Sequence, residues 1–400
     1  MKGYINGNKQ IISIKEKTCR ERGRVVEWKK SFSEDNVNKK DTSIELLRVF
    51  AMIMIVGYHV FCHCINEQLI SIRPNGFYSP DISMRLLVLV LVSPMGQMGN
   101  AIFIIISGYF MAHKGNNVDL TKTAKKLLSQ LAFAAVIIGL ASIVIYNKFP
   151  QLSLELIDFN GFNNLSWFVG YYFVIIVLGK LFLNNLLGRM DKKNYIMFLA
   201  VIFAMVSLYY SRYILVNFVT GLEVVFTGIF LYSLGGFIRR YNPFEKIRAW
   251  ALVAVIILIN LLVCGNYYIE AAKNIQAYNA GETGAFLQTI PLYANHQFVP
   301  IILAAAVFEL FRRINIPESK IINYLGASTF MVYLLHDNEF VYSIWKMHDW
   351  ITPLHDNMGM FFKDFFIWTM GTFCVGVLIY VIYMLVGKLP GIFRQLVYKK

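Results

Sequence analysis

Long runs of apolar residues, separated by short polar or basic segments, dominate this chain from about residue 44 to residue 386. The runs repeatedly exceed the roughly 18 residues that a helix needs to cross the hydrocarbon core of a bilayer. This pattern predicts an all-α, polytopic integral membrane protein with both ends of the chain on one side of the membrane. Ten helices are expected, at about residues 44–65, 86–111, 127–147, 165–187, 195–215, 218–238, 249–270, 290–310, 321–346 and 361–386.

The composition agrees with a membrane location. The positions of the Lys and Arg residues then indicate whether the positive charge reflects membrane topology or nucleic-acid binding. The chain is 57% hydrophobic, 16% charged and has a net charge of +14, with a mean hydropathy of +0.52. About 29 of the 38 Lys and Arg residues fall on one side of the ten spans. Cytoplasmic loops carry such an excess, so both termini are expected in the cytoplasm of a multi-pass plasma-membrane protein. The expected partners are the lipid bilayer with its anionic headgroups and an anionic cofactor, and not nucleic acid.

The same pattern of apolar and polar residues divides the chain into three parts. Residues 1–43 are dense in charged and polar residues and have few periodic apolar positions, which predicts a basic, mostly disordered cytoplasmic tail. Residues 44–386 form the membrane domain, and residues 387–400 form a basic cytoplasmic C-terminus. No secretory signal is expected, because no apolar stretch precedes Ile44.

Two ionisable residues lie inside the first apolar run. Arg48 and His59 are eleven positions apart, close to three helical turns, so they share one helix face at a separation of roughly 16 Å. Such groups are costly in lipid, so they are expected to face the protein interior and to mark function. Glu45 lies on the same face and can neutralise Arg48, either as part of a site or as an ordinary interfacial ion pair.

Helix geometry argues against a metal cluster beside His59. Cys62, His63 and Cys64 are neighbours in sequence, so they point to different helix faces. Only His59 and His63 have the spacing to share an ion, and no second group of Cys and His has a matching spacing. Free, buried thiols and no metal site are expected.

Other polar residues within the apolar runs have two interpretations each. Ser107 and the glycine after it suit the close approach of a helix backbone or of a ligand. Trp167 opens the fourth span, where aromatic residues usually form an interfacial belt. His336, Asp337 and Asn338 end the ninth span, either as surface polarity or as a buried group in which His336 meets His59 across the bundle.

The order and spacing of these residues resemble the acyltransferase 3 family of membrane proteins over residues 43–386. The likeness is closest to members from Gram-positive bacteria that sit among polysaccharide-synthesis proteins. The matching features are Arg48 and His59 with ten residues between them, Ser107-Gly108-Tyr109 ending the second span, Trp167-Phe168 opening the fourth, and Tyr333 through His336-Asp337-Asn338 ending the ninth.

The resemblance implies an O-acyltransferase that moves an acyl group, usually acetyl from acetyl-CoA, to a hydroxyl of a cell-surface or lipid-linked polysaccharide. The arginine and histidine that family members need for activity fall on Arg48 and His59. A cytoplasmic arginine pair of the relatives is represented here by Lys122, Lys125 and Lys126, which otherwise read as ordinary positive-inside charge.

Acyl transfer makes demands that these residues can meet. A sugar hydroxyl is a poor nucleophile at neutral pH, so His59 is expected either to remove its proton or to carry the acyl group itself. Arg48 is expected to contact CoA or to orient the thioester, helped by the lysines. The residues expected to support the site or to face the acceptor are His336, Asp337, Asn338, Glu45, Ser107 and Trp167.

Two other classes of function remain compatible with the chain. Ten spans with intramembrane charge would also suit a transporter or flippase for a carbohydrate or an acyl intermediate. No paired broken helices are visible in corresponding halves of the sequence, which favours the enzyme. A membrane sensor that binds a cell-wall ligand is the third possibility.

Overall fold

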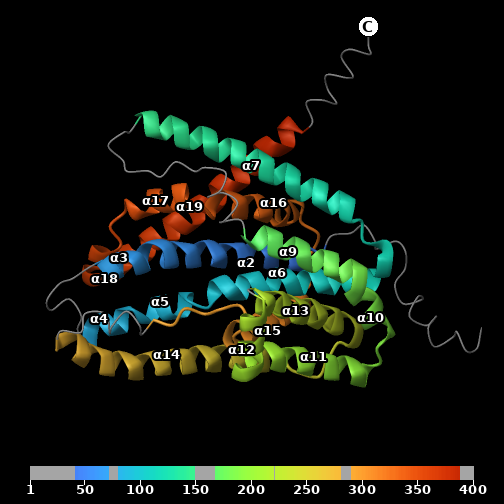
Figure 1. Ribbon diagram of the computed structural model, residues 1–400. Coiled ribbons are helices and arrows are strands. Elements are labelled where there is room, and N and C mark those ends of the chain that lie inside the picture. Colours follow the sequence, from blue (N-terminus) through green and yellow to red (C-terminus); the bar gives the residue numbers. More distant parts are fainter. Residues whose placement is uncertain (1–40, 72–79, 149–166, 220, 281–289, 388–400) are drawn as a thin grey trace, which may run out of the picture. The chain divides into compact units, whose positions relative to one another are not determined.

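The computed structural model describes residues 41–71, 80–148, 167–219, 221–280 and 290–387 (Figure 1). The predicted N-terminal tail therefore lies almost entirely outside the described residues, and so does the predicted C-terminal segment except for residue 387. The described residues form helices and connecting turns without a strand, so the all-α class is confirmed. The helices are α2 (Thr42–Val60), α3 (Asn66–Ser71), α4 (Pro80–Arg85), α5 (Leu87–Val92), α6 (Met95–Met111), α7 (Leu120–Lys148), α9 (Trp167–Leu178), α10 (Asn184–Arg189), α11 (Lys192–Ser207), α12 (Tyr209–Phe218), α13 (Leu222–Tyr241), α14 (Ala249–Asn279), α15 (Phe298–Arg313), α16 (Lys320–His336), α17 (Glu339–Lys346), α18 (Ile351–Asp356) and α19 (Met358–Val386).

The described helices include fewer candidate membrane spans than the ten that the sequence predicts. Seven are long and apolar enough to cross a bilayer, or eight if α11 and α12, which meet at a bend of 68°, count as one span. The bend lies at Leu208, whose backbone is extended rather than helical. Helices α15 and α16 contain 16 and 17 residues, short of the roughly 18 that span the hydrocarbon. The count of ten is therefore not confirmed, although a helix lies at each expected position.

Burial separates central helices from peripheral ones. In the most apolar stretches of α2 and of the segment that contains α6, 78% of the residues are buried, compared with 22% in α7, 11% in α14 and 22% in α19. Helix α2 packs on α6, α16 and α19, and α6 packs in turn on α13 and α15. The helix with Arg48 and His59 is thus enclosed by protein, whereas α7, α14 and α19 present most of their apolar surface outward.

Glycines allow α6 and α13 to touch backbone to backbone. A Cβ atom added at Gly108 would lie 1.9 Å from the carbonyl oxygen of Tyr232, and one added at Gly235 would lie 2.2 Å from that of Ile105. This is the small-residue packing that membrane helices use for close approach. Of the two interpretations of the Ser107-Gly108 pair, the structure supports approach of a helix backbone.

Several helix termini meet at one end of the bundle. The Ser43 hydroxyl at the start of α2 donates to the carbonyl of Ile314 just after α15. The Arg312 guanidinium of α15 donates to Asn242, which caps the C-terminus of α13. We call this the basic end, because its helix termini carry Lys122, Lys125, Lys126, Arg239, Arg240, Arg312 and Arg313.

A cap of short helices covers the opposite end. The side-chain amide of Gln68 in α3 donates to the carbonyls of Lys346 and His348 at 3.1 and 2.7 Å, and its oxygen accepts from the Trp350 amide at 3.0 Å. Arg85 of α4 donates to the carbonyl of His355 in α18. These bonds tie the continuation of α2 to the segment that follows α16.

Candidate functional site

Two histidines from distant parts of the chain meet in the bundle interior. The Nδ1 atom of His59 in α2 lies 3.1 Å from Nε2 of His336 at the last position of α16. His59 is 9% exposed and His336 is 1% exposed. Of the two interpretations of His336, the structure supports the buried one, in which the residue faces His59.

The hydrogen bonds of His336 determine which nitrogen of each ring carries the proton. The Nδ1 atom of His336 lies 2.7 Å from the carbonyl oxygen of Val332, which can only accept, so this Nδ1 carries the hydrogen. In a neutral imidazole the other nitrogen is then an acceptor, so His336 Nε2 accepts from Nδ1–H of His59. Neutral His59 therefore has an unprotonated Nε2 with a lone pair available for chemistry.

A carboxylate lies beside this pair. Oδ1 of Asp337 is 3.8 Å from Nδ1 of His59. It accepts a hydrogen bond from the Tyr342 hydroxyl, and the Tyr333 side chain also hydrogen-bonds this carboxylate. Asp337 is 6% exposed, so its negative charge is held within the protein by hydroxyl groups. A positive charge on His59 would have a counter-charge at close range.

The Asn338 side chain organises the turn that follows His336 and bonds to backbone groups rather than to a histidine ring. Its side-chain oxygen accepts from the Val341 amide at 3.0 Å and caps α17, while its amide donates to the Leu335 carbonyl at 2.8 Å. These bonds stabilise the turn between α16 and α17. Asn338 therefore fixes the helix end that presents His336 and Asp337.

The helix that carries His59 changes its winding immediately after it. Residues Phe61–Ile65 form a π-helical turn, a feature common at functional sites. In this turn His63 stacks on the ring of Tyr342, with centroids 4.0 Å apart and planes 9° apart, and meets His59 edge-on at 5.4 Å. Sequence reasoning did not place His63 or Tyr342 in the site, although the four-residue spacing of the two histidines was a usable signal for the former.

Arg48 and Glu45 form the expected ion pair, at 3.0 Å between Nη1 and Oε1. The Glu45 carboxylate is pressed against α16, because a Cβ atom added at Gly326 would lie 2.2 Å from Oε2 of Glu45. The Arg48 side chain is 31% exposed. No contact between Arg48 and His59 occurs among the described residues, in agreement with a helical rise of roughly 16 Å over eleven positions.

The aromatic start of α9 approaches the histidines through Phe168 rather than through Trp167. The Phe168 ring packs edge-on against Tyr333 at 5.5 Å, and Tyr333 packs against the ring of His336 at 5.9 Å. Trp167 is 42% exposed and stacks on Tyr171. The structure thus places Trp167 at the outer surface of this cluster.

Ser107 connects α6 to α9. Its hydroxyl lies 2.9 Å from the Phe103 carbonyl and 3.2 Å from the Tyr172 hydroxyl. No contact of Ser107 with His59 or His336 occurs in the described part of the chain. The structure assigns Ser107 to helix packing near the site.

The lysines expected to bind a cofactor lie on a peripheral helix. Lys122, Lys125 and Lys126 are exposed in the first turns of α7. Helix α7 packs on α9 and α16 at its inner side, not on α2 to any large extent. The lysines and Arg48 are therefore on different helices.

A buried ion cluster at the basic end was not anticipated from the sequence. Glu309, fully buried, accepts from Arg312 at 2.7 and 2.8 Å and from Arg313 at 2.7 Å. Arg239 donates to the Tyr109 hydroxyl at 3.0 Å and covers its ring. The spacing of Glu309 from the two arginines, three and four positions, was the signal that could have revealed the cluster.

The fold and the site together define a polytopic α-helical membrane protein with a histidine pair and a carboxylate buried near one end of its central helix. A model of the acyltransferase 3 family, described as an acyltransferase domain, matches residues 41–387, and the chain belongs to this family. No curated protein and no solved structure matches the chain. The protein is a membrane acyltransferase.

Proposed function

We propose that this acyltransferase moves an acyl group, in the first instance acetyl, from acyl-CoA to a hydroxyl of a cell-surface or lipid-linked polysaccharide in the plasma membrane. The basic end and both termini would face the cytoplasm, since Lys and Arg concentrate there. The observation that carries the proposal is the hydrogen-bond chain from Val332 through His336 to His59, which leaves a lone pair on Nε2 of His59.

The proposed step uses that lone pair as a general base. The acceptor hydroxyl oxygen attacks the thioester carbonyl carbon while Nε2 of His59 takes the hydroxyl proton, forming a C–O bond. The tetrahedral intermediate then collapses, the C–S bond breaks, and the departing CoA thiolate receives the proton back from His59. The products are an O-acyl ester and free CoA, and His59 returns to its neutral state.

The neighbours of His59 suit this cycle. While Nε2 holds the proton, Nδ1–H continues to donate to His336, so the ring cannot turn away. Asp337, at 3.8 Å, offsets the positive charge of the imidazolium. A buried carboxylate that offsets the charge of a histidine general base is a recurring feature of acyl transfer.

We assign Arg48 to the donor. It lies nearer to the basic end than His59 by eleven helical positions, is partly exposed, and is held by Glu45. A guanidinium binds phosphate or polarises a carbonyl through several N–H groups. Donor and acceptor would thus approach His59 from opposite ends of the bundle, and Arg48 and His59 would act at two points along one path.

Purified full-length protein in lipid nanodiscs, labelled acetyl-CoA and a polysaccharide acceptor provide the test. We expect His59→Gln to lower the rate of transfer by about 10²–10⁴-fold. The matched control is His113→Gln at the exposed residue His113, which we expect to retain the rate. Wild-type rates in the His59→Gln variant would overturn the proposal.

Direct transfer is distinguishable from an acyl-histidine intermediate. We expect no burst of free CoA when enzyme and acetyl-CoA are mixed rapidly without acceptor, because the thioester is attacked only by the acceptor hydroxyl. A burst stoichiometric with enzyme that disappears in His59→Gln would instead show that His59 carries the acyl group.

A further inference from the structure

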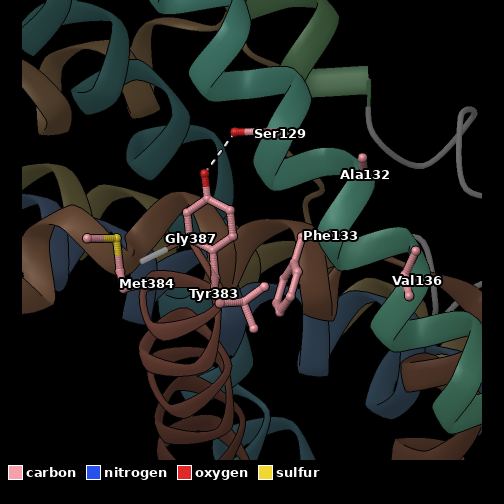
Figure 2. A pocket seen from close by; sticks show the side chains of 8 residues that line it. Ser129, Ala132, Phe133, Val136, Tyr383, Met384 and Gly387 are labelled. Atoms are coloured by element: carbon pink, nitrogen blue, oxygen red, sulfur yellow. Dashed lines mark hydrogen bonds between the residues drawn. The ribbon is translucent and has the colours of Figure 1, made fainter. Parts of the chain in front are cut away.

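A groove opens between the peripheral helices α7 and α19 (Figure 2). It has a volume of about 600 Å³. Its walls come from the middle of α7 and from the end of α19. The lining residues are Ser129, Ala132, Phe133 and Val136 on one side and Tyr383, Met384, Val386 and Gly387 on the other.

The groove is apolar except at one point. The hydroxyl groups of Ser129 and Tyr383 are 2.8 Å apart and bridge the two helices (Figure 2). The Phe133 ring meets the Tyr383 ring edge-on at 5.3 Å and forms the apolar wall next to them. An occupant therefore meets hydroxyl groups first and hydrocarbon beyond them.

One face of α7 continues this change from apolar to polar side chains as far as the water. Lys122, Lys125 and Lys126 precede Ser129 by seven, four and three positions, so they lie on the same helix face as Ser129. Ala132, Phe133 and Val136 follow at three, four and seven positions on that face. Over roughly 21 Å this face passes from cations to a hydroxyl to apolar side chains.

We propose that this groove binds one acyl chain of an anionic phospholipid whose phosphate group is held by Lys122, Lys125 and Lys126. The order of side chains along this face of α7 matches the order of groups in such a lipid, namely phosphate, glycerol ester and hydrocarbon. Only 22% of the apolar stretch of α7 and 22% of that of α19 are buried, so both helices face the bilayer from which the lipid would enter. Clustered lysines at a membrane surface attract anionic headgroups.

The lipid site gives the three lysines a task separate from donor binding. They lie on an outward helix, whereas Arg48 lies on the enclosed helix α2. Acetyl-CoA has no long hydrocarbon chain to fill an apolar groove of this size. The inference rests on the proposed orientation, which puts the groove in the cytoplasmic leaflet, but not on the chemistry at His59.

Lipid retention by the full-length protein tests the site. The protein is purified in detergent, incubated with equal amounts of phosphatidylglycerol and phosphatidylcholine of identical chains, and analysed by native mass spectrometry. We expect phosphatidylglycerol to be retained about tenfold more, and the triple variant Lys122→Gln, Lys125→Gln, Lys126→Gln to lose this preference. The matched control, Lys193→Gln with Lys246→Gln, removes two exposed lysines from the same end and should keep it.

A second variant tests the groove independently of the charge. Ala132→Trp fills the apolar part and leaves all three lysines, and we expect it to reduce retention of phosphatidylglycerol about tenfold. Equal retention of the two lipids by the wild type, or undiminished retention by Ala132→Trp, would overturn the proposal. So would a triple variant that retains phosphatidylglycerol but needs more acetyl-CoA for half-maximal rate, because the lysines would then serve the donor.

Two further arms separate the possible explanations. Palmitoyl-CoA that displaces phosphatidylglycerol and is itself retained more strongly would identify a long-chain acyl-CoA as the occupant and contradict the lipid assignment. His59→Gln should keep the lipid preference while losing acyl transfer. A His59→Gln variant that keeps wild-type transfer would contradict the proposed function alone, whereas a wild-type protein that transfers the acyl group but shows no preference for phosphatidylglycerol would contradict the lipid site alone.

Discussion

His59 and His336 are 277 positions apart, and their rings are joined by a hydrogen bond of 3.1 Å between Nδ1 of the former and Nε2 of the latter. The Val332 carbonyl gives that bond its direction, because it forces the proton of His336 onto Nδ1. His336 thus acts through His59, as a positioning residue that selects the tautomer in which Nε2 is free.

We predict that His336→Phe lowers kcat about 10–100-fold with little change in the KM for acetyl-CoA, because the ring of His59 loses its acceptor but the donor site is intact. His336→Gln, whose side-chain oxygen can accept from Nδ1–H, should recover part of the loss. Steady-state kinetics on both variants provide the measurement. If kcat were lowered equally in His336→Phe and His336→Gln, the ring of His336 would matter only for packing.

Asp337→Asn should reduce kcat about tenfold or more while the folded state survives. The substitution keeps the shape of the side chain, but it removes the negative charge that lies 3.8 Å from His59. A proton held on His59 during transfer then has no counter-charge in the protein interior. Transfer rates and thermal unfolding are measured together, and an Asp337→Asn enzyme with a wild-type kcat would show that the carboxylate has only a structural role.

Glu309→Gln should destabilise the protein by about 2 kcal/mol, because the Arg312 and Arg313 side chains lose their shared counter-charge. We take a value below that for a fully buried pair, since the two arginines are 20% and 24% exposed. Chemical or thermal unfolding in detergent provides the measurement. Glu245→Gln, at an exposed position of the same end, is the control and should unfold like the wild type.

Gly108→Ala should destabilise the protein by about 3 kcal/mol, because its Cβ atom would lie 1.9 Å from the Tyr232 carbonyl oxygen and the backbones of α6 and α13 would have to separate. The control is Gly139→Ala on the outward helix α7, where nothing lies within 4 Å of the added atom. That substitution should leave the unfolding midpoint unchanged or raise it slightly. Equal midpoints for the two variants would contradict the close packing of α6 and α13.

The amino-acid sequence predicts the local features of this protein better than the contacts between helices. The helix positions, the Glu45–Arg48 pair and the wide separation of Arg48 and His59 all follow from periodicity within one segment. The stacking of His63 on Tyr342 does not, because it depends on a π-helical turn and on the packing of segments that are far apart in sequence. The count of ten spans is not confirmed, because α15 and α16 contain only 16 and 17 helical residues.

The π-helical turn Phe61–Ile65 divides the first membrane helix into two segments of different rotational phase. Residues counted onto a helical wheel from Arg48 keep their correct face as far as Val60, but each later residue is displaced around the axis. Deleting one residue within the turn would restore a uniform α-helix and leave His59 where it is. It would also leave Gln68 near its present face, whereas winding the undeleted sequence as a uniform α-helix would turn Gln68 by roughly 100° and break its bonds to His348 and Trp350. The turn therefore lets one helix direct His59 toward His336 and Gln68 toward the segment after α17, which no uninterrupted α-helix of this sequence could do at once.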